Sequence, residues 1–187
     1  CLESGFGKTA SNMTYGGRTI FANHASGYIH VEHQVSLSAG DTIRSKRNFK
    51  HLLYNHGVMV KSYWADNGVF SSTEFEKEIL KGSQQITFSG VGAQHQNGVA
   101  ERAIRTVVER ARTMLIHASI RNPEFVDVSL WPFALTHSCH VWNSVPKLQQ
   151  FAPVELLSRS MTERNYSDLR HLHVWGCPVY ILEYDVV

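Results

Sequence analysis

The stretch Tyr63-Trp64-Ala65-Asp66-Asn67-Gly68 closes an apolar run that begins at Val58, and it decides the fold of this chain. Such a run predicts a buried strand that ends at a turn carrying an aspartate. A second stretch, Gln96-Asn97-Gly98-Val99-Ala100-Glu101-Arg102, opens a long helix, because apolar residues recur as far as Ala118 with the spacing of one helical face. One acid therefore ends a strand and another lies in the first turn of a helix.

These two acids, Asp66 and Glu101, are separated by one predicted helix and one predicted strand. A capping-box pattern at residues 71–74 opens the helix, which ends near Gly82, and residues 85–88 form the strand. This arrangement can bring both carboxylates to one divalent cation, because carboxylate oxygens are hard ligands that Mg²⁺ accepts. We therefore predict that Asp66 and Glu101 are catalytic residues and metal ligands.

Each acid also has a plainer explanation. Asp-Asn-Gly is a common turn signal, because Asp and Asn bond their own backbone and Gly takes a positive φ. Glu101 could stabilise a helix N-terminus or pair with Arg105 one turn later. The ordered pair of motifs favours catalysis over either explanation alone.

Length and composition limit the domain count and the class of partner. The chain has 187 residues, 43% of them hydrophobic, which suffices for one sizeable core and an appendage. We predict a core over residues 1–148 and a C-terminal extension over residues 149–187. Because the chain begins at Cys1 without Met, we expect a fragment, truncated at its N-terminal side. The net charge of +2 excludes a polycation, so any nucleic-acid surface is a local patch.

Cysteine content and hydropathy predict an intracellular protein. Cys1, Cys139 and Cys177 are odd in number and not closely spaced, which argues against a disulfide framework and favours a cytoplasmic or nuclear setting. The longest uncharged stretch, residues 128–146, contains His, Ser, Thr, Asn and Pro, so it predicts a buried helix and no membrane partner. The tryptophans Trp131, Trp142 and Trp175 are predicted to be core or interface aromatics.

The remaining elements follow from local patterns. Residues 18–25 and 27–37 predict a strand hairpin. Residues 41–57 predict a helix that begins with Asp41 as its N-cap. A further helix is predicted over residues 130–144 and a final strand over residues 179–183.

Polar and basic residues around Glu101 are candidates for nucleic-acid binding. Residues 99–121 carry five Arg against two Glu, and Arg102, Arg105 and Arg112 are predicted to contact DNA phosphates. The alternative is an ordinary solvated helix face. Residues 89–98 contain three glycines and no periodicity, which predicts a mobile loop. Its side chains Gln94, His95 and Asn97 either contact a nucleic-acid strand or are simply exposed polar residues.

Several motifs together resemble a known family. Ala25-Ser26-Gly27-Tyr28-Ile29, Ala65-Asp66-Asn67-Gly68 and the stretch 96–102 are similar, in order and spacing, to the catalytic core of retroviral and retrotransposon integrases. Residues 152–157 and 169–177 resemble the stretch that follows this core in copia-type elements. The resemblance covers nearly the whole chain. It implies an α/β, ribonuclease-H-like fold, in which helices flank a mixed five-stranded sheet.

The resemblance also implies an activity, its cofactors and its partners. Integrases are polynucleotidyl transferases that process DNA 3′ ends and join them to target DNA by transesterification. Two Asp and one Glu bind two Mg²⁺ or Mn²⁺ in such enzymes. Asp66 matches the second Asp of that set and Glu101 matches the Glu. Double-stranded DNA, from element ends and target, and further copies of the chain in a homo-oligomer are the implied partners.

One departure from the family pattern limits this prediction. The first family Asp lies on a strand upstream of residues 18–25, yet this chain has no Asp before Asp41, and Glu3 is the only acid in residues 1–17. We therefore predict that the first strand is missing or incomplete and that the chain alone is inactive. Two hypotheses follow. The chain is either the truncated core of a DNA-joining enzyme or a remnant that folds and binds DNA or a partner without catalysis.

Overall fold

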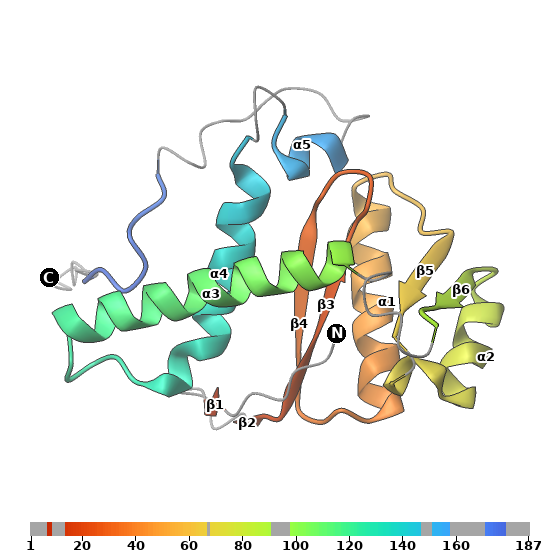
Figure 1. Ribbon diagram of the computed structural model, residues 1–187, viewed down its shortest axis with the longest axis horizontal. Helices are drawn as coiled ribbons and strands as arrows, with labels where there is room; N and C mark the ends of the chain where they lie inside the picture. The colour runs from red at the N-terminus through yellow and green to blue at the C-terminus, as the bar shows by residue number, and fades with distance from the viewer. Residues whose placement is uncertain are drawn as a thin grey trace, which may run out of the picture.

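A computed structural model describes residues 7–8, 14–66, 68–90, 98–146, 151–157 and 171–178. The elements in chain order are β1 (Gly7–Lys8), β2 (Thr14–Tyr15), β3 (Gly17–Ala22), β4 (Ile29–Gln34), α1 (Ala39–Asn55), β5 (Ser62–Ala65), the 3₁₀ turn η1 (Val69–Ser71), α2 (Thr73–Lys81), β6 (Gln85–Phe88), α3 (Gly98–Arg121), the 3₁₀ turn η3 (Val128–Leu130), α4 (Trp131–Ser144) and α5 (Pro153–Leu157). The hairpin β3–β4 lies between α1 on one side and α3 with α4 on the other (Figure 1).

The strands form three separate pairs. Strands β1 and β2 are antiparallel, β3 and β4 are antiparallel, and β5 and β6 are parallel. The α/β class is confirmed. The predicted five-stranded sheet is not found in the described part of the chain, because no hydrogen-bonded strand joins the edge of β3 to the edge of β5 there.

The turn between β3 and β4 is set by Asn23, which ends β3 three residues earlier than the sequence predicts. The Oδ1 of Asn23 accepts the backbone N–H groups of Ala25 and Ser26, at 3.0 and 2.9 Å. Gly27 closes the turn with φ 70°, in the left-handed region that glycine adopts most easily. Because the Asn23 side chain bonds the turn, residues 24 and 25 leave the ladder, while the N–H of Asn23 still donates to the Tyr28 carbonyl at 2.8 Å.

Helix α1 begins earlier than predicted. Its N-cap is Ser38, whose Oγ accepts the N–H of Asp41 at 3.2 Å, so the expected N-cap Asp41 instead lies inside the first turn. The Asp41 carboxylate accepts the N–H of Ser36, two residues before the N-cap, at 3.0 Å. Farther along α1, Phe49 stacks on Phe21 of β3, with ring centroids 4.4 Å apart. This contact fixes α1 on one face of the hairpin.

Helices α1 and α2 are joined through Glu78. Its two carboxylate oxygens accept Nε and Nη2 of Arg47 at 2.9 and 2.7 Å. The ammonium of Lys46, whose side chain is 1% exposed, lies 3.9 Å from Glu78 Oε1 and donates to the Glu78 carbonyl at 3.4 Å. Burial lowers the pKa of Lys46, and the charge of Glu78 acts in the opposite direction. Glu78 therefore provides the negative charge beside a buried cation.

We expect Glu78→Gln to lower the free energy of unfolding by about 1 to 1.5 kcal/mol, because the buried Lys46 ammonium then keeps only a neutral acceptor. Arg47→Gln is the matched control. Since the Arg47 side chain is 61% exposed, its loss is expected to lower the free energy of unfolding less than Glu78→Gln does. Urea denaturation of both variants measures the difference, and equal losses would rule out the role given to Lys46.

Helices α3 and α4 form the largest core cluster with the hairpin. Val107, Ala111, Ala134 and Leu135 have no exposed surface, and the Ser138 hydroxyl donates to the Val107 carbonyl at 2.8 Å. The three tryptophans predicted as core or interface aromatics pack against this cluster, which confirms that prediction. The predicted strand over residues 179–183 lies outside the described residues.

The described residues include two of the three cysteines and all of the helices named above. The described cysteines, Cys139 and Cys177, are both free. None of the described helices has the length and apolarity needed to cross a bilayer.

Candidate functional site

Asp66 follows directly after β5 and is half-buried. Its Oδ1 accepts the backbone N–H of Gly68 at 3.3 Å, so the turn role proposed for this Asp is present. A turn role leaves the second oxygen for another partner, because a carboxylate has two oxygens and about four acceptor sites. The turn explanation and the metal-ligand prediction are therefore compatible.

Glu101 lies in the first turn of α3 and is half-buried. Within the described part of the chain, it forms no ion pair with Arg105, so that alternative explanation is wrong. Its place in the first turn does fit an acid that stabilises the positive end of the helix dipole. Its carboxylate is thus in no ion pair with the residues that the structure describes.

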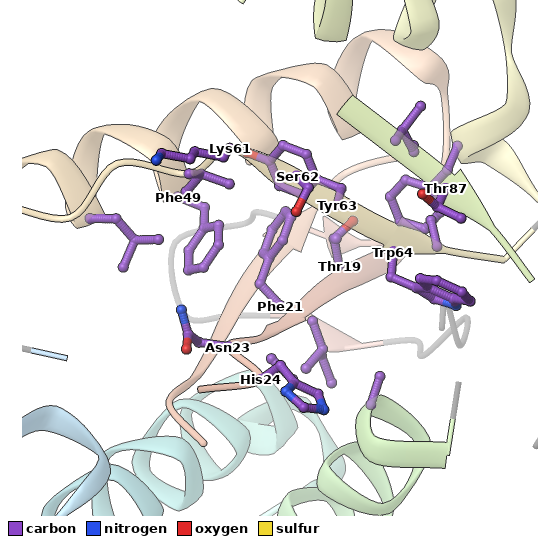
Figure 2. Close-up of a pocket in the computed structure, with 18 of the residues that line it drawn as sticks. Thr19, Phe21, Asn23, His24, Phe49, Lys61, Ser62, Tyr63, Trp64 and Thr87 are labelled. Carbon is purple, nitrogen blue, oxygen red and sulfur yellow. The ribbon is translucent and has the colours of Figure 1, made fainter. Parts of the chain in front are cut away.

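The ends of β5 and α3 meet at one cavity of about 600 Å³. Ala65, the residue before Asp66, and Ala100, the residue before Glu101, both line its wall. Side chains from β3 and from residues 61–64 surround the same space (Figure 2). The two acids, distant in sequence, are thus each adjacent to a wall residue of the same cavity.

Three lining residues were not singled out as site residues from the sequence. Trp64, in β5 two positions before Asp66, is 53% exposed. Asn23 and His24, at the end of β3, line the cavity from the opposite side (Figure 2). Strand alternation could have identified Trp64, whereas only the fold brings Asn23 and His24 there.

Tyr63 is the lining residue with a large pKa shift. Burial raises the pKa of its phenol to about 12, and a hydrogen bond from Gln84 Nε2 at 3.5 Å acts weakly in the opposite direction. The phenol therefore keeps its proton near neutral pH. It is a neutral hydrogen-bonding group in the wall and not a base.

The donor set fits a divalent cation in kind but not in number. Carboxylate oxygens are suitable ligands for Mg²⁺ or Mn²⁺. However, no group of three or more His, Cys, Asp or Glu suited to a metal is found among the described residues. The sequence predicts two carboxylate ligands, Asp66 and Glu101, whereas the family resemblance implies three.

The predicted DNA-binding residues divide into two groups. Arg102, Arg105 and Arg112 are exposed on α3, and none of them forms an ion pair with any described residue. Their guanidinium groups are therefore available to an anionic partner. Arg110, another arginine of α3 and not one of the predicted DNA contacts, lies over the Trp142 ring, 5.2 Å from its centroid. Gln94, His95 and Asn97 lie outside the described residues.

Comparison with known sequences gives two plant relatives. The chain is 31% identical over 125 residues to "Retrovirus-related Pol polyprotein from transposon TNT 1-94" of Nicotiana tabacum, a match that covers 66% of the chain. It is 32% identical over 135 residues to the corresponding protein from transposon RE1 of Arabidopsis thaliana, which covers 71%. The chain is homologous to a segment of plant transposon Pol polyproteins. It spans only 9% and 8% of their lengths. No protein-family model matches the chain.

Solved integrase structures have the same fold. A chain of the simian T-cell lymphotropic virus intasome, solved with the PP2A regulatory subunit B56 gamma, aligns with a TM-score of 0.61 and 18% identity, covering 100% of this chain and 57% of that one. The HTLV-2 integrase catalytic core domain in complex with magnesium, in dimeric form, aligns with a TM-score of 0.57 and 15% identity, covering 83% and 92%. The resemblance of this Pol segment to integrase cores is confirmed.

Proposed function

We propose that this Pol segment is the catalytic core of a copia-type retrotransposon integrase, which joins DNA ends to a target by transesterification at a phosphodiester. The observation that carries the proposal is that the residues preceding Asp66 and Glu101 line one cavity of an integrase-like fold. Homology to transposon Pol polyproteins supports it. Asp66 and Glu101 are the proposed catalytic and metal-binding residues.

The proposed cofactor is Mg²⁺ or Mn²⁺, and the proposed partners are double-stranded DNA and further copies of the chain. The carboxylate donors suit such an ion, and one integrase core of the same fold was solved with magnesium. Integrase cores of this fold occur in dimeric and trimeric forms, and another neighbour is part of an intasome. These relatives support the partners by analogy of fold.

Strand joining on a labelled DNA end with Mn²⁺ tests the proposal. The assay compares this chain, a version extended upstream by a strand with an Asp of the kind that the family resemblance implies, and Asp66→Asn in each background. We expect joining by the extended version and none by its Asp66→Asn variant. Equal joining by the variant and its parent would reject the metal role of Asp66.

The second candidate function is a remnant that binds DNA or a partner without catalysis. The observation that favours it is that no group of three or more His, Cys, Asp or Glu suited to a metal is found among the described residues. If the chain is a remnant, the version extended upstream still binds DNA but joins no ends in the same assay. The two candidates therefore predict opposite results for one protein.

Charge removal on α3 tests the DNA contact separately from catalysis. We expect the double substitution Arg102→Gln and Arg105→Gln to reduce the slope of log Kd against log salt concentration by roughly 2, because each lost phosphate contact releases about 0.9 fewer counterions. Arg121→Gln, in the last turn of α3, is the matched control and should leave the slope unchanged. Fluorescence anisotropy at several salt concentrations gives these slopes. A slope that is the same for the double variant and the wild-type chain would exclude phosphate contact at Arg102 and Arg105.

A further inference from the structure

A second pocket, of about 700 Å³, lies where helices α1 and α2 both end, at the right of the view in Figure 1. Its walls are the last two turns of α1, residues 58–62 and the turn between α2 and β6, and we call it the helix-end pocket. Residues 58–62 also line the first cavity, so this segment separates the two spaces. Strand β5 begins at the helix-end pocket and leads to Asp66, roughly 13 Å away at 3.3 Å per residue.

Both helix ends at this pocket are closed by the same backbone motif. The left-handed residue is Gly57 after α1, with φ 71°, and Ser83 after α2, with φ 52°. The N–H groups that follow each helix donate back to carbonyls of its last turn at 2.9 to 3.1 Å, which is the Schellman pattern. The Nε2 of buried Gln84 donates to the Val60 carbonyl at 2.8 Å and ties the end of α2 to the separating segment. The walls are therefore held in place by the fold itself.

Two large side chains of the helix-end pocket are mostly exposed. Tyr54 is 69% exposed and Met59 is 76% exposed, whereas Val58 and Val60 are half-buried and pack against a core cluster. Tyr and Met are enriched in protein interfaces, because Tyr offers a large rigid surface and Met adapts its shape to a partner. The pocket therefore presents an apolar surface suited to one anchoring side chain.

The charge of the helix-end pocket is positive. Among the described residues that line it, Lys50 and Lys61 are cationic and none is acidic. Neither lysine forms an ion pair with any residue that the structure describes. Each helix C-terminus contributes roughly half a negative charge, and Lys81 in the last turn of α2 offsets one of the two. The two lining lysines thus leave a net attraction for an anion.

We propose that the helix-end pocket binds an acidic peptide segment of a partner protein. An apolar side chain of the segment contacts Tyr54 and Met59, and its carboxylates pair with Lys50 and Lys61. Charge complementarity selects this occupant, because the two cations of the pocket have no acidic neighbour in its lining. The contact uses neither Asp66 nor Glu101, so it is independent of the proposed DNA joining.

Duplex DNA is the other anionic partner to consider, and it fits this pocket less well. A phosphate backbone is bound by many cations along its path, whereas the pocket supplies two. The exposed apolar surface gains little from phosphates and more from an apolar side chain that leaves water. The pocket volume also lies within the range of about 300 to 1,000 Å³ that is usual for concave binding sites.

Fluorescence anisotropy with a labelled peptide and the full chain tests the proposal. The probe is Gly-Asp-Glu-Leu-Phe-Glu-Asp-Gly with fluorescein at its N-terminus, and we expect saturable binding that weakens as salt is added. A peptide with Asn and Gln in place of Asp and Glu should bind about tenfold more weakly, because it loses both ion pairs. A peptide with Ser-Ser in place of Leu-Phe should lose about as much, because it lacks the anchor. Equal binding of all three peptides overturns the proposal.

Charge removal in the pocket identifies the cations involved. We expect Lys50→Gln and Lys61→Gln each to weaken peptide binding about threefold, and the double variant about tenfold. Lys77→Gln is the matched control, because Lys77 is an exposed lysine of α2 outside the lining of both cavities. Thermal unfolding followed by circular dichroism checks that all variants fold, as expected for exposed positions. A double variant that binds like Lys77→Gln overturns the proposal.

Methionine methyl signals in NMR spectra locate the bound peptide. The chain has four methionines, of which Met59 lines the helix-end pocket and Met114 lies in α3. In a chain labelled at the methionine methyl groups, Met59→Leu and Met114→Leu assign the two signals. We expect the Met59 signal to shift with the Kd found by anisotropy and the Met114 signal to stay in place. A Met59 signal that does not move at saturating peptide overturns the proposal.

A short duplex of random sequence distinguishes the two anionic partners. We expect the duplex to leave the Met59 signal and the bound peptide unchanged. Displacement of the peptide by the duplex, with a shift of the Met59 signal, would assign the pocket to nucleic acid and overturn the peptide assignment. Failure of strand joining would count against the proposed function alone, because peptide binding requires neither metal nor Asp66.

Discussion

Asn143→Ala is expected to lower the free energy of unfolding by about 2 to 4 kcal/mol. The Asn143 side chain accepts the N–H of Ile29 at 2.9 Å and donates to the Ile29 carbonyl at 2.7 Å. Both groups are buried, so truncation leaves a donor and an acceptor unpaired, each at a cost of roughly 1 to 3 kcal/mol. Urea denaturation of the full chain measures the loss.

Ser144→Ala is the control for Asn143→Ala, because it truncates the next residue of α4, which is only half-buried. Its effect should stay within about 0.5 kcal/mol. Amide exchange gives a second measurement, since the N–H of Ile29 should exchange faster in Asn143→Ala. A loss below about 1 kcal/mol with unchanged exchange at Ile29 would show that α4 does not support this edge of the hairpin.

Elements with strong local signals were predictable from the sequence. The short helix α2 was predictable, although its N-cap is Ser72, whose Oγ accepts the N–H of Phe75 at 3.3 Å, one residue later than the predicted capping box over residues 71–74. The apolar stripe of α3 predicts a helix, and the observed helix contains the whole predicted range. Strand β6 has the predicted bounds. These signals lie within a few residues of the element that they specify.

The predicted start of β5 was wrong for a nonlocal reason. Residues 58–65 are apolar enough for a strand, yet β5 begins at Ser62, opposite Gln85 of β6. The N–H of Val58 donates to the Leu53 carbonyl at 2.9 Å, which ties Val58 to the end of α1. A strand extends only where a partner is available, and hydropathy does not contain that information.

In the candidate site too, the residues with local sequence signals were predictable and those that depend on distant contacts were not. The positions of Asp66 and Glu101, after a strand and in the first turn of a helix, were predictable because each lies in a motif with a local signal. Asn143 was not identifiable, because its partner Ile29 is 114 positions away and an Asn within a helix gives no local signal of such a contact. The helix-end pocket likewise depends on where α1, α2 and β5 meet in space.

Acidification from pH 7 to pH 5 is expected to lower the free energy of unfolding by about 2 kcal/mol through His33. Burial lowers the pKa of His33 to about 4, and the nearby charge of Arg18 acts in the same direction. The unfolded value is near 6.5, so the unfolded chain takes up this proton first. The His33 contribution is therefore fully present above pH 6.5 and is lost as the pH falls towards 4.

His33→Gln tests this contribution, because glutamine stays neutral over the whole range and can still bond Thr136 Oγ1, which lies 3.0 Å from His33 Nε2. The variant should lose most of the slope of stability against pH between 7 and 5. A smaller slope of the same sign should remain, since burial also lowers the pKa of His137. Glu32 and Glu78 have lowered pKa values and contribute below this window.

Because burial is the main cause of the lowered His33 pKa, the wild-type slope of stability against pH should persist in 0.5 M NaCl. Its disappearance there would assign the effect to the Arg18 charge instead.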